Sequence, residues 1–135
     1  MFQPKHFLDL AENLKDSPKD NLFESRIRTS IGRSYYSIFL ATRYKIEVLI
    51  NKELEKKRNI HEVVIDNLKK SVDNQIAQFG TNLDTLRNYR LQADYRIKTN
   101  LHQNIANGAY ALANDLFNDL KNLPDTILKT IFQSI

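Results

Sequence analysis

The chain has 135 residues, of which 41% are hydrophobic and 27% are charged, and it contains neither cysteine nor tryptophan. A chain of this length fits one domain with its own core, so we expect a single domain over residues 1–135. The lack of cysteine excludes a disulfide framework, a thiol nucleophile and zinc sites with sulfur ligands. No two of the three histidines have the close spacing of a metal site, and we expect neither a metal nor a cofactor.

The formal charge of +4 arises from 20 basic and 16 acidic residues. This excess is compatible with a nucleic-acid partner, but many ordinary domains carry as much. No apolar stretch approaches the roughly 20 residues that a membrane span requires, and the N-terminus lacks the core of a signal peptide. We therefore expect no membrane association and a cytoplasmic location.

The first half of the chain shows the periodicity of helices. Apolar residues spaced by three and four predict a short first helix around residues 7–14. A break at Ser17 and Pro18 follows, and residues 21–55, which contain no proline, predict one long second helix. Small residues form a stripe along this helix, at Ser30, Ser34, Ser37 and Ala41. The stripe indicates either the close approach of a second neighbouring helix or an exposed face that tolerates serine.

The second half begins with a charged run, residues 52–58, that we expect to be solvated. Asn59 and Glu62 have the spacing of a capping box and predict a third helix from there to Gly80. A weaker start signal at Thr81 predicts a fourth helix, whose apolar positions extend to Ile97.

A break at Thr99 and Asn100 separates this fourth helix from a fifth, which Asn100 and Gln103 are expected to cap. Pro124 ends the fifth helix and begins a short tail helix. The fold predicted from these elements is all-α, an up-and-down bundle of four to six helices with one long second helix.

The fourth predicted helix carries charges on one face. Arg87, Arg90 and Asp94 lie at i, i+3 and i+7, so they share that face. Arg90 and Asp94 have the spacing of an ion pair, and an inward-facing set would have to be mutually satisfied. Arg33 on the long helix is expected either to contact a phosphate or to pair with Asp94. Of Tyr35 and the adjacent Tyr36, one is expected in the core and the other on the polar face or at a dimer contact.

The chain resembles HEPN domains (higher eukaryotes and prokaryotes nucleotide-binding) from about residue 7 to residue 120. Residues 28–39, which read RTSIGRSYYSIF, resemble the long-helix motif of that family. Two later blocks add to the resemblance, namely His61 after a charged loop, and Leu86-Arg87 followed by Ala93-Asp94-Tyr95.

The resemblance implies a four- or five-helix bundle that forms homodimers. It also implies a role in a toxin–antitoxin or defence system, often beside a minimal nucleotidyltransferase. Many members are metal-independent ribonucleases that use an arginine, a polar residue and then a histidine after four to six intervening positions. Some carry a tyrosine two residues beyond that histidine, which the nucleotidyltransferase adenylylates.

Placed on this sequence, the pattern assigns Arg87 and Asn88 as the arginine and its polar neighbour. Ala93 stands where the histidine is expected, and Tyr95 stands at the position of the modified tyrosine. Alanine cannot take a proton from a 2′-hydroxyl, so the usual catalytic pair is broken. His61 is the substitute we consider, because the first turn of a helix disfavours its protonated form and would keep a base neutral.

The sequence therefore leaves two alternative functions open. The first is an RNA-directed protein that cleaves or binds RNA, with Arg87, Asn88 and His61 as catalytic residues. In it, Arg33, Arg90 and Asp94 would form the binding face. The alternative is a catalytically inactive dimer that serves as an interaction module for a nucleotidyltransferase or another effector, and Ala93 favours it.

Overall fold

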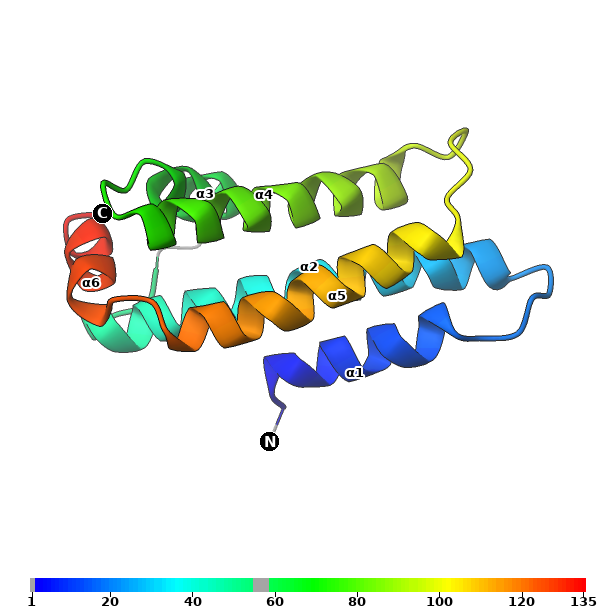
Figure 1. The fold of residues 1–135 in the computed structure, drawn as a ribbon, viewed down its shortest axis with the longest axis horizontal. Helices are drawn as coiled ribbons and strands as arrows, with labels where there is room; N and C mark the ends of the chain where they lie inside the picture. The colour runs from blue at the N-terminus through cyan, green and yellow to red at the C-terminus, as the bar shows by residue number, and fades with distance from the viewer. Residues whose placement is uncertain (1, 55–58) are drawn as a thin grey trace.

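The computed structural model describes residues 2–54 and 59–135, and every regular element in these two ranges is an α-helix. The helices are α1 (Pro4–Lys15), α2 (Phe23–Ile50), α3 (Ile60–Lys69), α4 (Asn74–Tyr95), α5 (Gln103–Lys121) and α6 (Asp125–Gln133). Helices α1, α2, α4 and α5 run alternately up and down the long axis, and α6 lies across one end (Figure 1). The predicted all-α bundle with a long second helix is confirmed.

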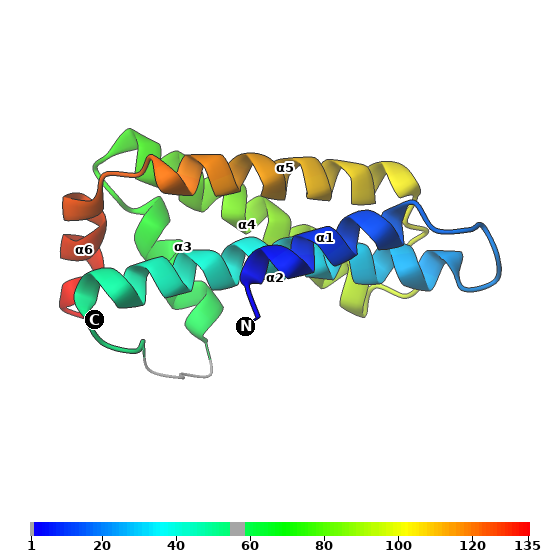
Figure 2. The ribbon, with the colours of Figure 1, turned by 90° about the horizontal axis from the view of Figure 1, so that it is seen from below.

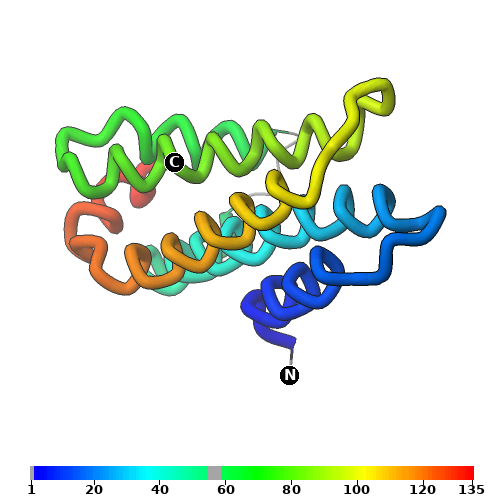
Figure 3. The backbone as a smooth tube through the Cα atoms, turned by 45° about the vertical axis from the view of Figure 1, so that its right-hand side comes forward, coloured from blue at the N-terminus to red at the C-terminus, as the bar shows by residue number. Residues whose placement is uncertain are grey.

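Helix α2 is the centre of the bundle, because it packs against α1, α4, α5 and α6. Figure 2 shows α6 closing the end at which α2 and α5 finish. Helices α3 and α4 lie on one side of α2 and α5, and α1 lies on the other (Figure 3). Large apolar side chains of α2 lie in the core between these helices, among them the fully buried Ile31, Ile38 and Phe39. A helix covered on several sides needs buried residues on more than one face, as the sequence of α2 provides.

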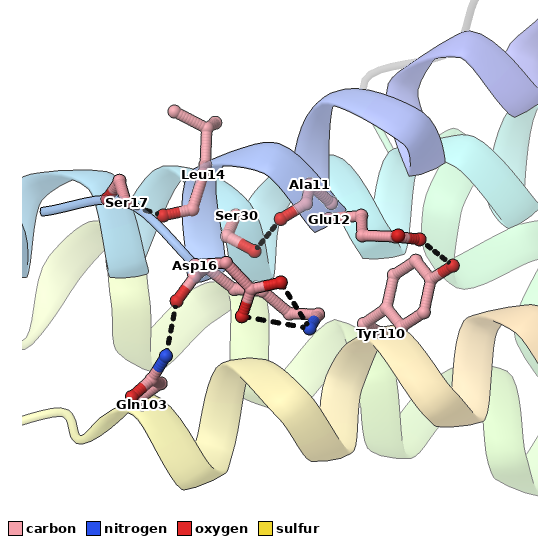
Figure 4. Close-up of polar contacts among 9 residues, drawn as sticks. Ala11, Glu12, Leu14, Asp16, Ser17, Ser30, Gln103 and Tyr110 are labelled. Atoms are coloured by element: carbon pink, nitrogen blue, oxygen red, sulfur yellow. Dashed lines mark hydrogen bonds and ion pairs between the residues drawn. The ribbon is translucent and has the colours of Figure 1, made fainter.

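The stripe of small residues on α2 is the place where α1 approaches. Ser30, Ser34 and Ser37 are fully buried, and the hydroxyl of Ser30 donates to the carbonyl of Ala11 at 2.7 Å. Figure 4 shows this contact together with the Gln103 amide of α5, which reaches a carbonyl of α1. The prediction of a close helix contact is confirmed, and the exposed-face alternative is wrong.

The predicted boundary between the third and fourth helices is wrong. Helix α3 ends at Lys69 and α4 begins at Asn74, so Gly80 lies inside α4 and does not end α3. The carboxylate of Asp73 caps α4 by accepting from the backbone N–H of Ile76 at 2.9 Å. Val72, an apolar residue whose spacing from Val64 and Leu68 predicts a buried position on the third helix, lies in the connection and is 98% exposed.

Other helix ends also differ from the prediction. Helix α2 stops five residues early, because Asn51 adopts the left-handed conformation with φ of 57° and ends the helix. Residues 55–58, within the charged run expected to be solvated, lie outside the described residues. Asn59 does precede α3, but its side chain makes no capping hydrogen bond, so the capping box is not formed. His102, and not Asn100, is the residue that precedes α5.

Two predicted core positions are exposed. Leu10, one of the regularly spaced apolar residues that predict the first helix, faces solvent on α1, where Leu8 is buried instead. Ile97 lies beyond the end of α4 and is also exposed. Along residues 2–54 and 59–135, no helix has the length and apolarity that crossing a membrane requires.

Candidate functional site

Packing of α2 and α3 against α4 brings ionisable and aromatic side chains into one group, which we call the polar cluster. Its members are Arg33, Tyr35 and Tyr36 from α2, His61 and Glu62 from α3, and Arg87, Arg90 and Asp94 from α4. Most of the residues singled out from the sequence therefore do lie together.

The face of α4 expected from the spacing is formed. The Nε of Arg90 lies 2.8 Å from an oxygen of Asp94, and a terminal nitrogen of Arg87 lies 4.0 Å from an oxygen of Glu62. The arginine side chains are only 21% (Arg87) and 15% (Arg90) exposed, whereas both carboxylates are considerably more exposed. Positive charge is therefore held inward and negative charge outward.

Both inward arginines keep a nitrogen without a well-aligned partner. The Nε atoms of Arg87 and Arg90 are buried, and within residues 2–54 and 59–135 neither makes a hydrogen bond of good geometry. The contact from Arg90 to Asp94 is close in distance but poorly aligned, so it acts as an ion pair and leaves the N–H direction unused. Two buried donors of the cluster are thus unsatisfied within the described residues.

The ring of Tyr36 lies between two guanidinium groups. Arg33 is 5.6 Å and Arg90 5.1 Å from the centre of this ring, which are cation–π distances. Arg33 also lies 4.7 Å from the ring of Phe7 on α1. The pairing of Arg33 with Asp94 that we considered is not formed, because Arg33 packs on aromatic rings and Asp94 pairs with Arg90.

His61 is held in the polar cluster by an aromatic ring and a hydroxyl group. Its ring stacks on Phe39 with centroids 4.1 Å apart, and its Nδ1 lies 2.6 Å from the hydroxyl of Tyr35. Burial first, and then the positive charges of Arg87, Arg90 and Arg43, lower the pKa of His61 to about 4. The imidazole is therefore neutral near pH 7, for reasons other than the helix position considered from the sequence.

The lowered pKa predicts a pH dependence of stability that belongs to His61. Between about pH 6.5 and pH 4 the unfolded chain binds a proton at this residue that the folded protein excludes, so stability falls as the pH falls through this window. Urea unfolding midpoints should therefore decrease less between pH 7 and pH 4 in His61→Gln than in the wild type. The charged and titratable groups around this imidazole are Tyr35, Tyr36, Arg43, Glu62, Arg87 and Arg90. Asp84 lies near the Tyr35 side of this group, because its charge acts on the Tyr35 hydroxyl.

The exposed His102 provides the control for this experiment. His102→Gln should follow the wild-type pH dependence, because this side chain is solvated at the start of α5. Equal changes in the two variants would contradict the assignment to His61.

Three residues of the family pattern lie away from these contacts. Asn88 is exposed and lines a shallow pocket on the outer side of α4, together with Tyr95. Ala93 is buried where α4 approaches α2, and the next residue, Asp94, lies 3.9 Å from the position of a Cβ on Gly32. Tyr95 is 69% exposed at the end of α4, with its ring 5.9 Å from the guanidinium of Arg90.

Sequence reasoning missed the function of Arg28, which lies within the family-like segment of α2. Its guanidinium donates to four backbone carbonyls at and beyond the end of α4, those of Gln92, Ala93, Arg96 and Thr99, at 2.6–3.3 Å. No local signal could have revealed these bonds, because the acceptors lie more than 60 residues away in the chain. The cap fixes the end of α4 that carries Asp94.

Comparison with known proteins gives one distant relative. No family model matches the chain, and no solved structure matches it. The chain is 30% identical over 111 residues to an uncharacterized protein of Methanocaldococcus jannaschii, an alignment that covers 73% of this chain. It spans 66% of the length of that relative, whose name states no activity.

Proposed function

We propose that this protein is a HEPN-like component of a toxin–antitoxin or defence system, and that it binds RNA or acts on it through the polar cluster. The observation that carries the proposal is the convergence of Arg87, Arg90 and His61 from two helices beside a long helix with the family-like motif. The net charge of +4 adds a favourable field for a polyanion.

The chemistry of these side chains suits a phosphate group. A guanidinium offers a planar fork of N–H donors that matches phosphate oxygens, and the side chains of Arg87 and Arg90 remain 21% and 15% exposed. Tyr36 adds a half-buried aromatic ring between two arginines, a surface of the kind on which unpaired bases stack. We expect single-stranded RNA to bind better than duplex RNA.

The corresponding prediction is that Arg87→Ala weakens RNA binding. We expect a loss of about tenfold in affinity for a short single-stranded RNA, and a decrease of about 1 in the slope of log affinity against log salt. Fluorescence anisotropy at several salt concentrations measures both quantities. Lys129→Ala is the control, because it removes one exposed positive charge from α6, a helix outside the cluster.

Two results would contradict RNA binding at this site. One is the absence of salt-dependent binding to any RNA tested. The other is an equal loss of affinity in Arg87→Ala and Lys129→Ala, which would show a response to net charge alone.

A second candidate function is that of a catalytically inactive homodimer that holds a nucleotidyltransferase or another effector. The burial of Ala93 and the outward position of Asn88 favour it, since neither residue can join a catalytic pair with Arg87 inside the cluster. In this proposal the exposed Tyr95 is the residue that a nucleotidyltransferase partner would adenylylate.

Tyr95 and Tyr44 form a matched pair for testing that modification, because they are 69% and 68% exposed on different helices. After incubation with the partner and ATP, we expect one adenylyl mass increment on the wild type and on Tyr44→Phe, and none on Tyr95→Phe. Peptide mass spectrometry locates the label. A label that persists in Tyr95→Phe would refute this placement.

A further inference from the structure

We propose that the polar cluster is a receptor for a phosphate-type oxyanion in which His61 is a hydrogen-bond donor through Nε2, and that Tyr35 is the positioning residue that holds it in this form. The inference rests on the proposed function for the source of the anion, a phosphodiester of RNA. The direction of the hydrogen bond between Tyr35 and His61 is argued from their contact and burial and does not depend on the proposed function.

The first step concerns the hydroxyl of Tyr35. The side chain is fully buried, and within residues 2–54 and 59–135 its hydroxyl has one hydrogen-bond partner, the Nδ1 of His61 at 2.6 Å. Burial raises the pKa of Tyr35, so the hydroxyl keeps its proton. If Nδ1 carried a proton and donated to this oxygen, the O–H of Tyr35 would be left without an acceptor in that part of the chain. Buried donors without acceptors are costly, so Tyr35 donates and Nδ1 accepts.

The second step follows from the chemistry of imidazole. A neutral ring has one protonated nitrogen, so an accepting Nδ1 places the proton of His61 on Nε2. This nitrogen lies on the other side of the ring from Tyr35 and can donate, but it has no lone pair with which to take a proton. To act as a general base, His61 would have to exchange tautomers and leave the Tyr35 hydroxyl unsatisfied. The role considered for His61 from the sequence, that of a base, is therefore disfavoured by its buried partner.

The third step concerns the ligand to which the Nε2–H of His61 would donate. Arg87 and Arg90 lie near enough to His61 for their charges to disfavour its protonation. Arg90 and His61 both lie against the ring of Tyr36, with the guanidinium 5.1 Å and the imidazole 5.7 Å from the centre of that ring. Two partly exposed guanidinium groups and one imidazole N–H, from two helices, thus lie near one another with an excess of positive charge, and Glu62 and Asp94 offset it only from more exposed positions. An oxyanion accepts hydrogen bonds on several lone pairs and reduces the repulsion between the arginines, so it satisfies this arrangement.

The test of the positioning role is nuclear magnetic resonance of ¹⁵N-labelled protein. Long-range ¹H–¹⁵N spectra near pH 7 report which ring nitrogen of His61 carries the proton, and His61→Gln identifies its signals. We expect a protonated Nε2 in the wild type and a shift toward protonated Nδ1 in Tyr35→Phe. Tyr36→Phe is the matched control and should keep the wild-type tautomer, since Tyr36 meets His61 with its ring and its hydroxyl is not bonded to it. A protonated Nδ1 in the wild type, or a tautomer unchanged by Tyr35→Phe, would overturn the inference.

The test of the receptor uses two probes, inorganic phosphate and a short single-stranded RNA. Each should shift the His61 signals with saturation, and Arg90→Lys, which keeps the charge but loses the planar fork of N–H donors, should weaken phosphate binding by about tenfold. Lys129→Ala should leave it unchanged.

The outcomes separate this inference from the proposed function. Binding of phosphate without RNA supports the receptor and rejects RNA as its ligand. Binding of RNA without any change at His61 supports RNA binding elsewhere on the protein and overturns the receptor. If neither probe moves the His61 signals, the receptor is also overturned.

Discussion

Gly80→Ala is expected to destabilise this protein by about 2 kcal/mol, although alanine is the better helix former by about 1 kcal/mol. Gly80 lies in α4 at the point where the end of α3 passes closest. A Cβ added there would stand 2.7 Å from the backbone nitrogen of Lys69 and 2.8 Å from the Cβ of Leu68. Because the nearest atom belongs to the backbone, a side-chain rotation cannot relieve the contact, and α3 would have to move away from α4.

Gly108→Ala is the matched control, because Gly108 is exposed on α5 and an added Cβ would meet nothing within 4 Å. We expect this substitution to stabilise the protein by about 0.5–1 kcal/mol. Urea unfolding monitored by circular dichroism measures both variants. Stabilisation by Gly80→Ala of the same size as by Gly108→Ala would show that α3 and α4 are not in close contact there.

Arg28→Ala is expected to cost about 2 kcal/mol of stability and to loosen the end of α4. One guanidinium donates to four carbonyls at the end of α4. Those of Gln92 and Arg96 also accept a backbone N–H, whereas those of Ala93 and Thr99 have no other hydrogen bond among the described residues. Its two shortest bonds, 2.6 Å to Thr99 and 2.8 Å to Ala93, are charge-assisted, and the bond to Ala93 is also partly shielded from water. Native-state hydrogen exchange should show the largest loss of protection in the last turn of α4, next to Asp94 and Tyr95.

Arg26→Ala is the control for this effect. Arg26 lies two residues earlier on α2 and pairs with Asp20 in a more exposed position, so its loss should cost less than about 1 kcal/mol. Arg28→Lys keeps the charge but cannot reach four acceptors with a planar fork, and we expect it to restore only part of the stability. Equal effects of Arg26→Ala and Arg28→Ala would contradict the capping role.

The periodicity of apolar residues was sufficient to predict the helices but not all of their boundaries. Gly80 followed by Thr81 has the local form of a helix end and a new start, yet the glycine serves a close contact between helices. Asp73, the true cap of α4, follows Val72, whose apolar character extended the predicted third helix. Whether α4 begins after Asp73 or at Thr81 depends on how α3 packs against α4. That packing is a tertiary contact, which the local sequence does not show.

The composition of the polar cluster was more predictable than its internal contacts. The i, i+3, i+7 spacing was enough to place Arg87, Arg90 and Asp94 on one face, and the structure places them there. Local spacing cannot specify partners on other helices, and for this reason the ring contacts of Arg33 and the hydroxyl beside His61 were not foreseen. The carbonyls bonded by Arg28 were missed for the same reason.

The burial of Ala93 restricts the introduction of a histidine at the position where the HEPN pattern has one. The side chain of Ala93 is buried, its carbonyl accepts from Arg28 of α2, and the carboxylate of the next residue, Asp94, lies 3.9 Å from the position of a Cβ on Gly32 of α2. The larger imidazole would not fit at this buried position unless α4 moved away from its neighbours. That movement would weaken the hydrogen bond between Arg28 and the carbonyl of residue 93. A single substitution would therefore damage the scaffold before it could supply a proton acceptor, and any engineered nuclease built on this chain needs its base introduced from a solvent-facing position.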